Sequence, residues 1–356
     1  MGDFNYYDLG FMEKQKSMLF FHALAIRNEE ALVIVSPRDI IASIGYFQNA
    51  RTSIDFDFCK KEKIPVMRRM VGGGTTLLDN NQIFYQIILK HDNLLNIKDK
   101  EYFFEKFSIP AINTYKKIGI ETRYKPVNDI ITIEKKKITG QGAGEIGECI
   151  VFVGGILLDF DYDLMSRILK VPDDNYRNNV YRNMQEGLTT VKRELGYIPD
   201  RKMIVSLLKG EWEKLLGNLK EAYFGEDEEK AISETSIMID NNDFLFGYNR
   251  EGKEKTKISS GNFLYKSSRK TKGGLLEIYV SIKDDTIAGL KINGDFMCHP
   301  VNLPVILETD LIGTKARKLE IENAIEDLYK LTDGSILGVS PSELSEIILS
   351  DQRGGE

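Results

Sequence analysis

Two arginines followed by three consecutive glycines form the stretch whose residue types best suit chemistry. Arg68 and Arg69 end a short apolar run, and Gly72, Gly73 and Gly74 follow after two further residues. Adjacent glycines cost conformational entropy, so a chain keeps them where its backbone turns sharply or approaches another molecule closely. Backbone N–H groups beside guanidinium groups suit a phosphate or a carboxylate. The stretch therefore favours an anion-binding loop, and the alternative is a glycine-rich hairpin with two solvated arginines.

A second stretch with chemical potential begins at Asn128 and ends near residue 147. Asn128 and Asp129 precede an apolar strand pattern, and a run of three lysines follows it. Lys137, the last of the three, directly precedes the returning strand and a segment, residues 140–147, that contains four glycines. This segment is predicted to be a flexible loop able to close over a bound molecule. The lysine run alone is typical of a solvated hairpin tip, but the position of Lys137 suits contact with a ligand.

The elements that position these stretches alternate between strand and helix patterns. Short runs rich in Val, Ile and aromatic residues predict strands at 31–36, 40–44, 64–68, 83–89, 130–134 and 149–158. Helical spacing of apolar residues predicts helices at 13–27, 56–63, 97–119 with a break at Pro110, 159–170 and 200–219. The glycine loop therefore joins two strands, unlike a nucleotide P-loop, which joins a strand to a helix.

The remainder of the chain predicts a second, smaller domain. Strand patterns at 262–267, 275–282 and 287–292 precede helical patterns at 304–309, at 320–331 and after Ser340. A polar passage at 248–257 separates this region from the first. We therefore expect a catalytic domain at residues 1–250 and an accessory domain at residues 258–356.

Bulk properties narrow the class of protein. The 356 residues are 42% hydrophobic and 29% charged, with a net charge of −6 and no long basic tract, which argues against nucleic-acid binding. The longest apolar run is too short to span a bilayer, and the N-terminus shows no secretory signal. Three cysteines and three histidines, all far from zinc-ligand spacing, suggest free thiols in a reducing cytoplasm and no zinc site.

Several of these stretches, in this order, resemble the lipoate–protein ligases. The resemblance rests on Arg68-Arg69 with the glycine triplet and Asp79, then Asn128-Asp129, then Lys137-Ile138-Thr139-Gly140, and then Gly155-Ile156-Leu157-Leu158. Residues 44–49 and 187–192 fit the same family, and residues 273–277 and 294–297 resemble its accessory C-terminal domain. The resemblance covers nearly the whole chain.

This resemblance implies an α+β fold: a biotin/lipoate-ligase-like mixed sheet with flanking helices, plus a small α+β C-terminal domain. It implies an adenylate-forming ligase that joins lipoate to ATP, with Mg²⁺, to make lipoyl-AMP and pyrophosphate. The lipoyl group then passes to a lysine on a lipoyl domain of a 2-oxoacid dehydrogenase acyltransferase subunit or on glycine-cleavage H protein. The sequence leaves open whether lipoate or octanoate is preferred.

The resemblance also assigns roles to individual residues. Lys137 is expected to contact the phosphate and carbonyl side of the acyl-adenylate, where a cation stabilises the oxyanion during transfer. Arg69 and the glycine triplet are expected to bind the adenylate. Asn128 and Asp129 are expected near the phosphates, with Asp129 as a Mg²⁺ ligand or, alternatively, as part of a turn before a strand. Further substrate-binding positions implied by the resemblance are Val71, Leu78, Thr139, Gly140 and Gly155.

Four positions depart from the family pattern. The family usually has Ser where Val71 stands, His where Leu78 stands, and a His pair where Val153 and Gly154 stand. Each change removes a polar side chain from the expected pocket, so the chain is expected to have a more apolar acyl pocket, another acyl substrate or no activation activity.

Three alternatives stay open. The first is an ATP-independent octanoyl or lipoyl amidotransferase that uses Cys149 as nucleophile, although a cysteine at the start of a buried strand is more often part of the core. The second is a degenerate ligase that only binds lipoate or lipoylated proteins. The third, a biotin ligase, lacks its expected Gly-Arg-Gly-Arg-type loop here.

Overall fold

The computed structural model describes residues 4–93, 95, 100–247, 256–259 and 262–350. The chain divides into two compact units. Unit 1 contains residues 1–44, 51–71 and 75–245, and unit 2 contains residues 45–50, 72–74 and 246–356. The predicted domain boundary falls largely on residues 248–255, which lie outside the described residues, so it stays a prediction.

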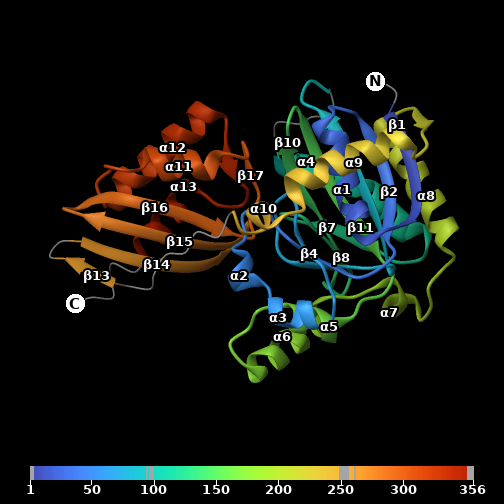
Figure 1. Ribbon diagram of the computed structural model, residues 1–356, viewed down its shortest axis with the longest axis horizontal. Helices are drawn as coiled ribbons and strands as arrows, with labels where there is room; N and C mark the ends of the chain where they lie inside the picture. Colours follow the sequence, from blue (N-terminus) through green and yellow to red (C-terminus); the bar gives the residue numbers. More distant parts are fainter. Residues whose placement is uncertain (1–3, 94, 96–99, 248–255, 260–261, 351–356) are drawn as a thin grey trace. The chain divides into compact units, whose positions relative to one another are not determined.

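Unit 1 is built on a six-stranded mixed sheet (Figure 1). Its strands, in spatial order, are β10 (Gly142–Ile146), β11 (Cys149–Leu157), β6 (Gln82–Lys90), β2 (Ala31–Pro37), β1 (Phe4–Met12) and β12 (Leu219–Glu221). The pairs from β10 to β2 are antiparallel, and β2–β1 and β1–β12 are parallel. Together with its flanking helices, this sheet confirms the predicted α+β fold.

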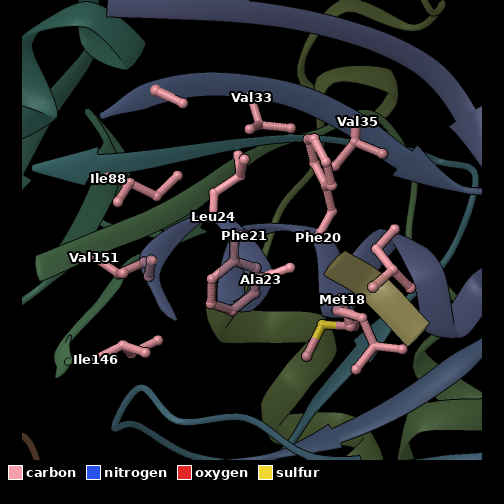
Figure 2. Packing of buried hydrophobic residues seen from close by; sticks show 14 of the residues in the cluster. Met18, Phe20, Phe21, Ala23, Leu24, Val33, Val35, Ile88, Ile146 and Val151 are labelled. Atoms are coloured by element: carbon pink, nitrogen blue, oxygen red, sulfur yellow. The ribbon is translucent and has the colours of Figure 1, made fainter. Parts of the chain in front are cut away.

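Alternate residues of the sheet face two different helix layers. On one face, α1 (Lys14–Ile26) and α9 (Glu226–Ile239) pack on side chains such as Val33, Ile88 and Val151 (Figure 2). On the other face, α4 (Lys100–Lys117) and α8 (Arg201–Leu216) pack through aromatic rings on Phe152 and Tyr85. This two-sided burial explains why every residue of β2 is buried and why residues 31–35 are all apolar.

Two three-stranded sheets complete the strand structure of unit 1. One has the order β4 (Val66–Arg68), β3 (Ile41–Ile44), β5 (Thr76–Leu78), and the other is the meander β7 (Thr122–Lys125), β8 (Asp129–Thr132), β9 (Lys137–Gly140). The remaining helices are α2 (Ala50–Ser53), α3 (Phe56–Lys61), α5 (Tyr162–Ile168), α6 (Asp174–Gly187), α7 (Val191–Leu195) and α10 (Asn242–Phe246). The predicted hairpin with Lys137 at the start of its return strand is confirmed.

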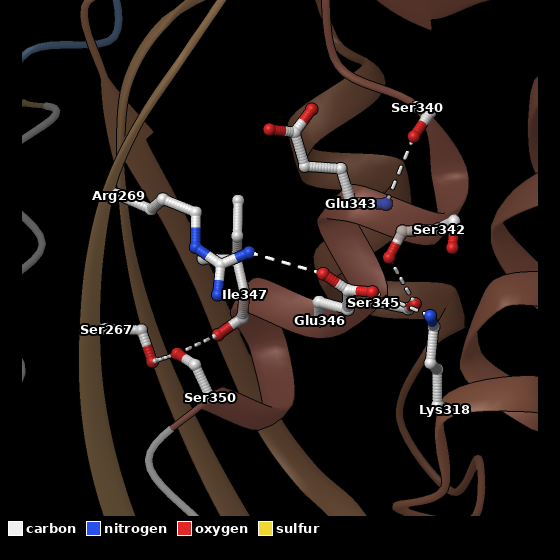
Figure 3. A network of polar contacts seen from close by, with 10 residues as sticks. All are labelled: Ser267, Arg269, Lys318, Ser340, Ser342, Glu343, Ser345, Glu346, Ile347 and Ser350. Carbon is white, nitrogen blue, oxygen red and sulfur yellow. Dashed lines mark hydrogen bonds and ion pairs between the residues drawn. The ribbon is translucent and has the colours of Figure 1, made fainter.

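Unit 2 contains an antiparallel sheet covered by helices. The sheet order is β13 (Thr256–Ser259), β14 (Asn262–Thr271), β15 (Gly274–Lys283), β16 (Thr286–Gly294), and β17 (Cys298–His299) pairs with β18 (Ser335–Ile336). The helices are α11 (Leu303–Asp310), α12 (Lys318–Thr332) and α13 (Pro341–Leu349), and they share one apolar core with β15 and β16. Glu346 of α13 makes ion pairs with Lys318 at 2.7 Å and with Arg269 at 3.5 Å (Figure 3).

Two expectations about local structure are wrong. Residues 140–147 are not a flexible loop, because Gly142–Ile146 forms edge strand β10, paired along its length with β11. The helix does not break at Pro110, which lies inside α4. Phe103, Phe107 and Ala111 are buried on that helix, and tertiary packing of this kind offsets the local cost of a proline. No helix in the described part of the chain combines the length and apolar character needed to cross a membrane.

Candidate functional site

Lys137 and Asp129 face each other across the β8–β9 hairpin. Asp129 pairs in register with Gly140, and the Lys137 ammonium lies 2.6 Å from the Asp129 carboxylate. The Lys137 side chain keeps 40% of its surface exposed. A Cβ on Gly140 would lie only 2.9 Å from the Lys137 Nζ, so the absence of a side chain at 140 lets the lysine lie along the strand. The hairpin thus presents an oriented, solvent-accessible cation.

Strand β9 is fixed from behind by a buried tyrosine on α4. The Tyr115 hydroxyl lies 2.8 Å from the Thr139 Oγ1, and the backbone N–H of Leu157 donates to it at 3.2 Å. Thr139 in turn donates to the backbone carbonyl of Gly155 at 2.8 Å. Burial raises the pKa of Tyr115 to about 12, so this hydroxyl stays protonated. Thr139 and Gly155, two predicted site residues, therefore join β9 to β11.

Asn128 belongs to a buried amide network. Its side-chain amide donates to the backbone carbonyl of Gln141 at 2.5 Å, and the Gln141 N–H donates back to the Asn128 carbonyl at 3.0 Å. The Gln141 side chain receives a bond from Ser108 of α4 at 2.7 Å and donates to the Tyr85 hydroxyl at 3.1 Å. Asn128 thus closes the junction between β8 and β10 beside Asp129.

The arginine pair is buried rather than solvated. The side chain of Arg69 is 8% exposed, and its Nη1 donates to the Ser43 carbonyl at 3.3 Å and to the Ser43 hydroxyl at 3.2 Å. Arg68 is 1% exposed and donates to the carbonyls of Phe244 and Leu245 in α10. A cation at the carboxyl end of a helix complements its dipole. The alternative of two solvated arginines is therefore wrong.

A histidine to which the sequence assigned no role, His22, hydrogen-bonds to the backbone next to Arg69. His22 of α1 is fully buried, and its Nε2 accepts a hydrogen bond from the backbone N–H of Met70 at 3.0 Å. Its Nδ1 lies 2.7 Å from the carbonyl of Met18. A polar residue inside the apolar sequence of α1 was the available signal, because a buried polar group needs partners.

Val71 and Leu78, where the family has polar residues, lie in an apolar cluster. Both are buried members of the core between α1 and the sheet, and Val153 packs against the same core. A Cβ on Gly144 would lie 3.0 Å from the Val71 Cα, so this glycine lets the Met70–Val71 backbone pass close to β10. Three of the departures from the family pattern thus meet on one apolar wall.

The fourth departure, Gly154, is filled from the neighbouring strand. Gly154 pairs in register with Tyr85, and a Cβ at 154 would lie 2.3 Å from the Tyr85 hydroxyl oxygen. Tyr85 is fully buried, and burial raises its pKa far above the usual range. Its ring therefore occupies the space that a histidine at position 154 would need.

The glycine triplet groups with unit 2. Gly73 has a φ of 97°, and its N–H donates to the Phe296 carbonyl at 3.2 Å. A Cβ on Gly72 would lie 2.5 Å from that same oxygen, so the triplet permits a close backbone approach. Contact of Gly72, Gly73 and Gly74 with an adenylate stays a prediction.

Apart from Arg69, which bonds to Ser43, the other predicted residues form two groups within unit 1. The polar group consists of Lys137, Asp129, Asn128, Thr139, Gly140 and Gly155. The apolar group contains Val71 and Leu78. Gly144 of β10 links the two groups, because it follows Gly140 closely in the chain and lies against Val71.

Coordination of Mg²⁺ by Asp129 stays a prediction. Among the described residues, no three His, Cys, Asp or Glu side chains gather in a way that could hold a metal ion. The Asp129 carboxylate is already ion-paired with Lys137. We therefore derive no step through a metal ion bound by Asp129.

Cys149 lies in an environment unsuited to a nucleophile. It is fully buried, its thiol contacts the Asn28 side chain at 3.3 Å, and burial, followed by the nearby Glu30, raises its pKa to about 11. It begins β11, six residues before Gly155, which corresponds to about 20 Å along a strand. A thiolate is therefore disfavoured here and distant from Lys137.

Comparison with known protein families gives matches in both parts of the chain. The family described as "Lipoyl protein ligase A/B catalytic domain" matches residues 16–212, and "Bacterial lipoate protein ligase C-terminus" matches residues 260–348.

Named relatives point the same way. A lipoate–protein ligase 2 of Staphylococcus aureus is 25% identical over 326 residues, which are 86% of each chain. Subunit 1 of the lipoate-protein ligase A of Thermoplasma acidophilum is 27% identical over 157 residues, 42% of this chain and 58% of the relative. An octanoyltransferase LipM of Clostridioides difficile is 26% identical over 185 residues, 47% of this chain and 66% of the relative.

Solved structures confirm the fold. A bipartite lipoate protein ligase of Thermoplasma acidophilum, studied with its E2 lipoyl domain, superimposes with a TM-score of 0.61 at 21% identity and covers 71% of this chain and 99% of its own. A lipoate-protein ligase A bound with ATP gives a TM-score of 0.57 at 21% identity, with coverage of 69% and 100%.

Proposed function

The chain belongs to the lipoyl protein ligase A/B family, a family of enzymes, and from that premise we propose that it is an ATP-dependent lipoate–protein ligase. In the first step, a carboxylate oxygen of lipoate attacks the α-phosphorus of ATP, and pyrophosphate leaves. In the second step, the amine of an acceptor lysine attacks the acyl carbonyl of lipoyl-AMP, and AMP leaves. The observation that carries this proposal is the exposed Lys137 ammonium, oriented by Asp129 at 2.6 Å.

Lys137 supplies the positive charge that both steps require. Negative charge develops on the phosphate during activation and on the acyl oxygen during transfer, and a preoriented cation stabilises both. The ammonium is held by a carboxylate yet remains 40% exposed, so it can turn from Asp129 to a bound acyl phosphate. The β9 contacts of Thr139 limit how far the lysine backbone can move.

Arg69 and the apolar wall formed by Val71 and Leu78 are proposed to bind different parts of the substrate. The buried charge of Arg69 and the glycine triplet are proposed to bind the adenylate, with Asn128 near the phosphates. The apolar wall at Val71 and Leu78 suits the hydrocarbon part of a medium-length acyl chain.

The proposed acceptors are lipoyl domains of 2-oxoacid dehydrogenase acyltransferase subunits and glycine-cleavage H protein. The first class is supported by the Thermoplasma acidophilum ligase, whose structural study includes its E2 lipoyl domain. The proposed nucleotide is supported by the related ligase that was solved with ATP.

ATP–pyrophosphate exchange tests the proposal. The purified chain is incubated with ATP, Mg²⁺ and labelled pyrophosphate, with lipoate or octanoate added in turn, and Lys137→Ala is compared with Lys136→Ala. Lys136 is the matched control, because it adjoins Lys137 but pairs with Glu134 at the hairpin tip, 2.9 Å away. We expect acid-dependent exchange that falls about 10²- to 10³-fold in Lys137→Ala and stays near the wild-type rate in Lys136→Ala.

Absence of exchange with either acid would overturn the ligase proposal. The similarity to an octanoyltransferase LipM then favours a second function, ATP-independent acyl transfer. Loss of such transfer in Cys149→Ser would be required for a reaction through this thiol, and the burial of Cys149 argues against it. Binding of lipoate without either reaction would indicate a degenerate ligase.

A further inference from the structure

The backbone between Arg69 and the glycine triplet receives a side-chain acceptor from a helix far away in the sequence. His22 of α1 accepts the hydrogen bond of the Met70 N–H through its Nε2, at 3.0 Å. The same imidazole contacts the Met18 carbonyl through its Nδ1, at 2.7 Å. Both polar atoms of a fully buried ring are therefore satisfied.

These two partners determine the tautomer of His22. A backbone carbonyl can only accept a hydrogen bond, so the Nδ1 facing Met18 must carry a proton. A backbone N–H can only donate, so the Nε2 facing Met70 must be without one. The ring is consequently the neutral Nδ1–H form, and protonation of Nε2 would remove the acceptor of the Met70 N–H.

The Met70 peptide lies between two residues assigned to the site. On one side, the Arg69 N–H donates to the Ile44 carbonyl at 3.0 Å, and its guanidinium donates to Ser43. On the other side, Val71 lies against Gly144 of β10. We propose that His22 is a positioning residue, which holds the Met70 peptide so that Arg69 and Val71 stay in place for the adenylate and the acyl chain. This inference rests on the proposed ligase function.

A histidine that only filled space in the core would affect stability and nucleotide binding differently from a positioning residue. It would contribute to stability, but its loss would not change nucleotide binding more than any other core substitution. Leu24 is the matched control, because it lies on the same helix as His22, belongs to the apolar cluster that contains Val71 and is 1% exposed (Figure 2). Leu24→Ala creates a cavity without removing the acceptor of the Met70 N–H.

The kinetic test compares three variants in ATP–pyrophosphate exchange. Leaving a buried N–H without its acceptor in His22→Leu is expected to raise KM for ATP about tenfold relative to Leu24→Ala, with a smaller change in kcat. His22→Gln carries both an amide oxygen and an amide N–H, so it is expected to restore KM to within about threefold of wild type. Equal KM values in His22→Leu and Leu24→Ala would overturn the inference.

A second measurement does not depend on activity. In full-length protein labelled with ¹⁵N at histidine and methionine, His22 is expected to show a protonated Nδ1 and an unprotonated Nε2 that keep their shifts from pH 8 to pH 5.5. The Met70 amide signal is expected to move in His22→Leu and to stay in Leu24→Ala. A protonated Nε2, or an unmoved Met70 signal, would overturn the positioning role even if exchange is observed. Normal spectra without exchange would instead overturn the ligase proposal alone.

Discussion

At residue scale, position 154 shows how neighbouring side chains compensate for a missing one. Gly154 lies opposite Tyr85 in the β6–β11 pair, and the tyrosine ring fills the space above it. The hydroxyl of Tyr85 accepts from Gln141, which also contacts Asn128. The departure from the family's histidine pair is thus part of a buried network that reaches the β8–β10 junction.

We expect Gly154→Ala to destabilise the protein by about 1–3 kcal/mol, because its Cβ would lie 2.3 Å from the Tyr85 hydroxyl. The destabilisation should be clearly smaller in a Tyr85→Leu background, where the ring is absent. Urea denaturation of both single variants and the double variant measures this coupling. Strictly additive free energies of unfolding would contradict the steric explanation.

At element scale, helix α4 supports the strand that carries Lys137. Tyr115 near the end of α4 contacts Thr139 of β9 and Leu157 of β11, and Ser108 contacts Gln141 between β9 and β10. On its other side, α4 is tied to α8, because Asn113 donates to Glu211 at 2.9 Å. The hydrogen bonds from α4 therefore restrict the movement of strand β9 in the β8–β9 hairpin.

We predict that Tyr115→Phe destabilises the protein by about 1–3 kcal/mol, because the part-buried N–H of Leu157 loses its acceptor. The exchange activity should also fall, since β9 is less firmly held. Chemical denaturation and amide hydrogen exchange at Leu157 measure the two effects. Tyr176→Phe, at a tyrosine that is 54% exposed, serves as the control and should change neither quantity. Unchanged protection at Leu157 would argue against this support by α4.

The elements that sequence could predict are those with a strong side-chain pattern. The apolar runs gave β2, β6 and β11, and the lysine run gave the β8–β9 hairpin. Strand β10 was missed because its glycines give no alternation of apolar and polar side chains, although the strand pairs with β11 along its length. Sequence could not show that Pro110 lies within a helix whose buried face outweighs the local cost.

The same limit applies to the candidate site. The adjacency of Asp129, Lys137 and Gly140 follows from one short hairpin, so local pattern was enough. The contact between His22 and Met70 spans 48 residues, and it depends on how α1 packs beneath the strands. No local sequence pattern predicts such a contact. The packing of Tyr85 over Gly154 is also a contact between residues distant in sequence, so it could not be predicted either.

At the scale of the whole molecule, two buried groups contribute to how the free energy of unfolding depends on pH. Burial, assisted by the positive charge of Arg69, lowers the pKa of His22 to about 3. For Glu211, burial alone would raise the pKa, but hydrogen bonds from Lys117, Lys214 and Asn113 outweigh it and bring the pKa to about 2. Both values lie below those of the unfolded chain, about 6.5 for histidine and about 4.3 for glutamate.

The direction of the effect follows from proton binding. Between pH 6.5 and pH 3 the unfolded state protonates the His22 imidazole while the folded state does not, so the free energy of unfolding falls as the pH falls. Glu211 contributes in the same direction, but only below about pH 5.3, one unit above the pKa of an unfolded glutamate. The interval from pH 6.5 to pH 5.3 therefore separates His22 from Glu211.

We predict that His22→Leu reduces the slope of unfolding free energy against pH in that interval by up to about 1.4 kcal/mol per pH unit, the effect of one proton. Glu211→Gln should leave this slope unchanged and weaken the pH dependence only below about pH 5.3. Urea denaturation at pH 7, 6.5, 6, 5.5, 5, 4 and 3.5 measures both slopes. His91 and His299 are present in every variant, so their protonation contributes equally to each curve. A slope in His22→Leu equal to that of wild type would mean that the imidazole is protonated in the folded state, which is incompatible with its bond to the Met70 N–H.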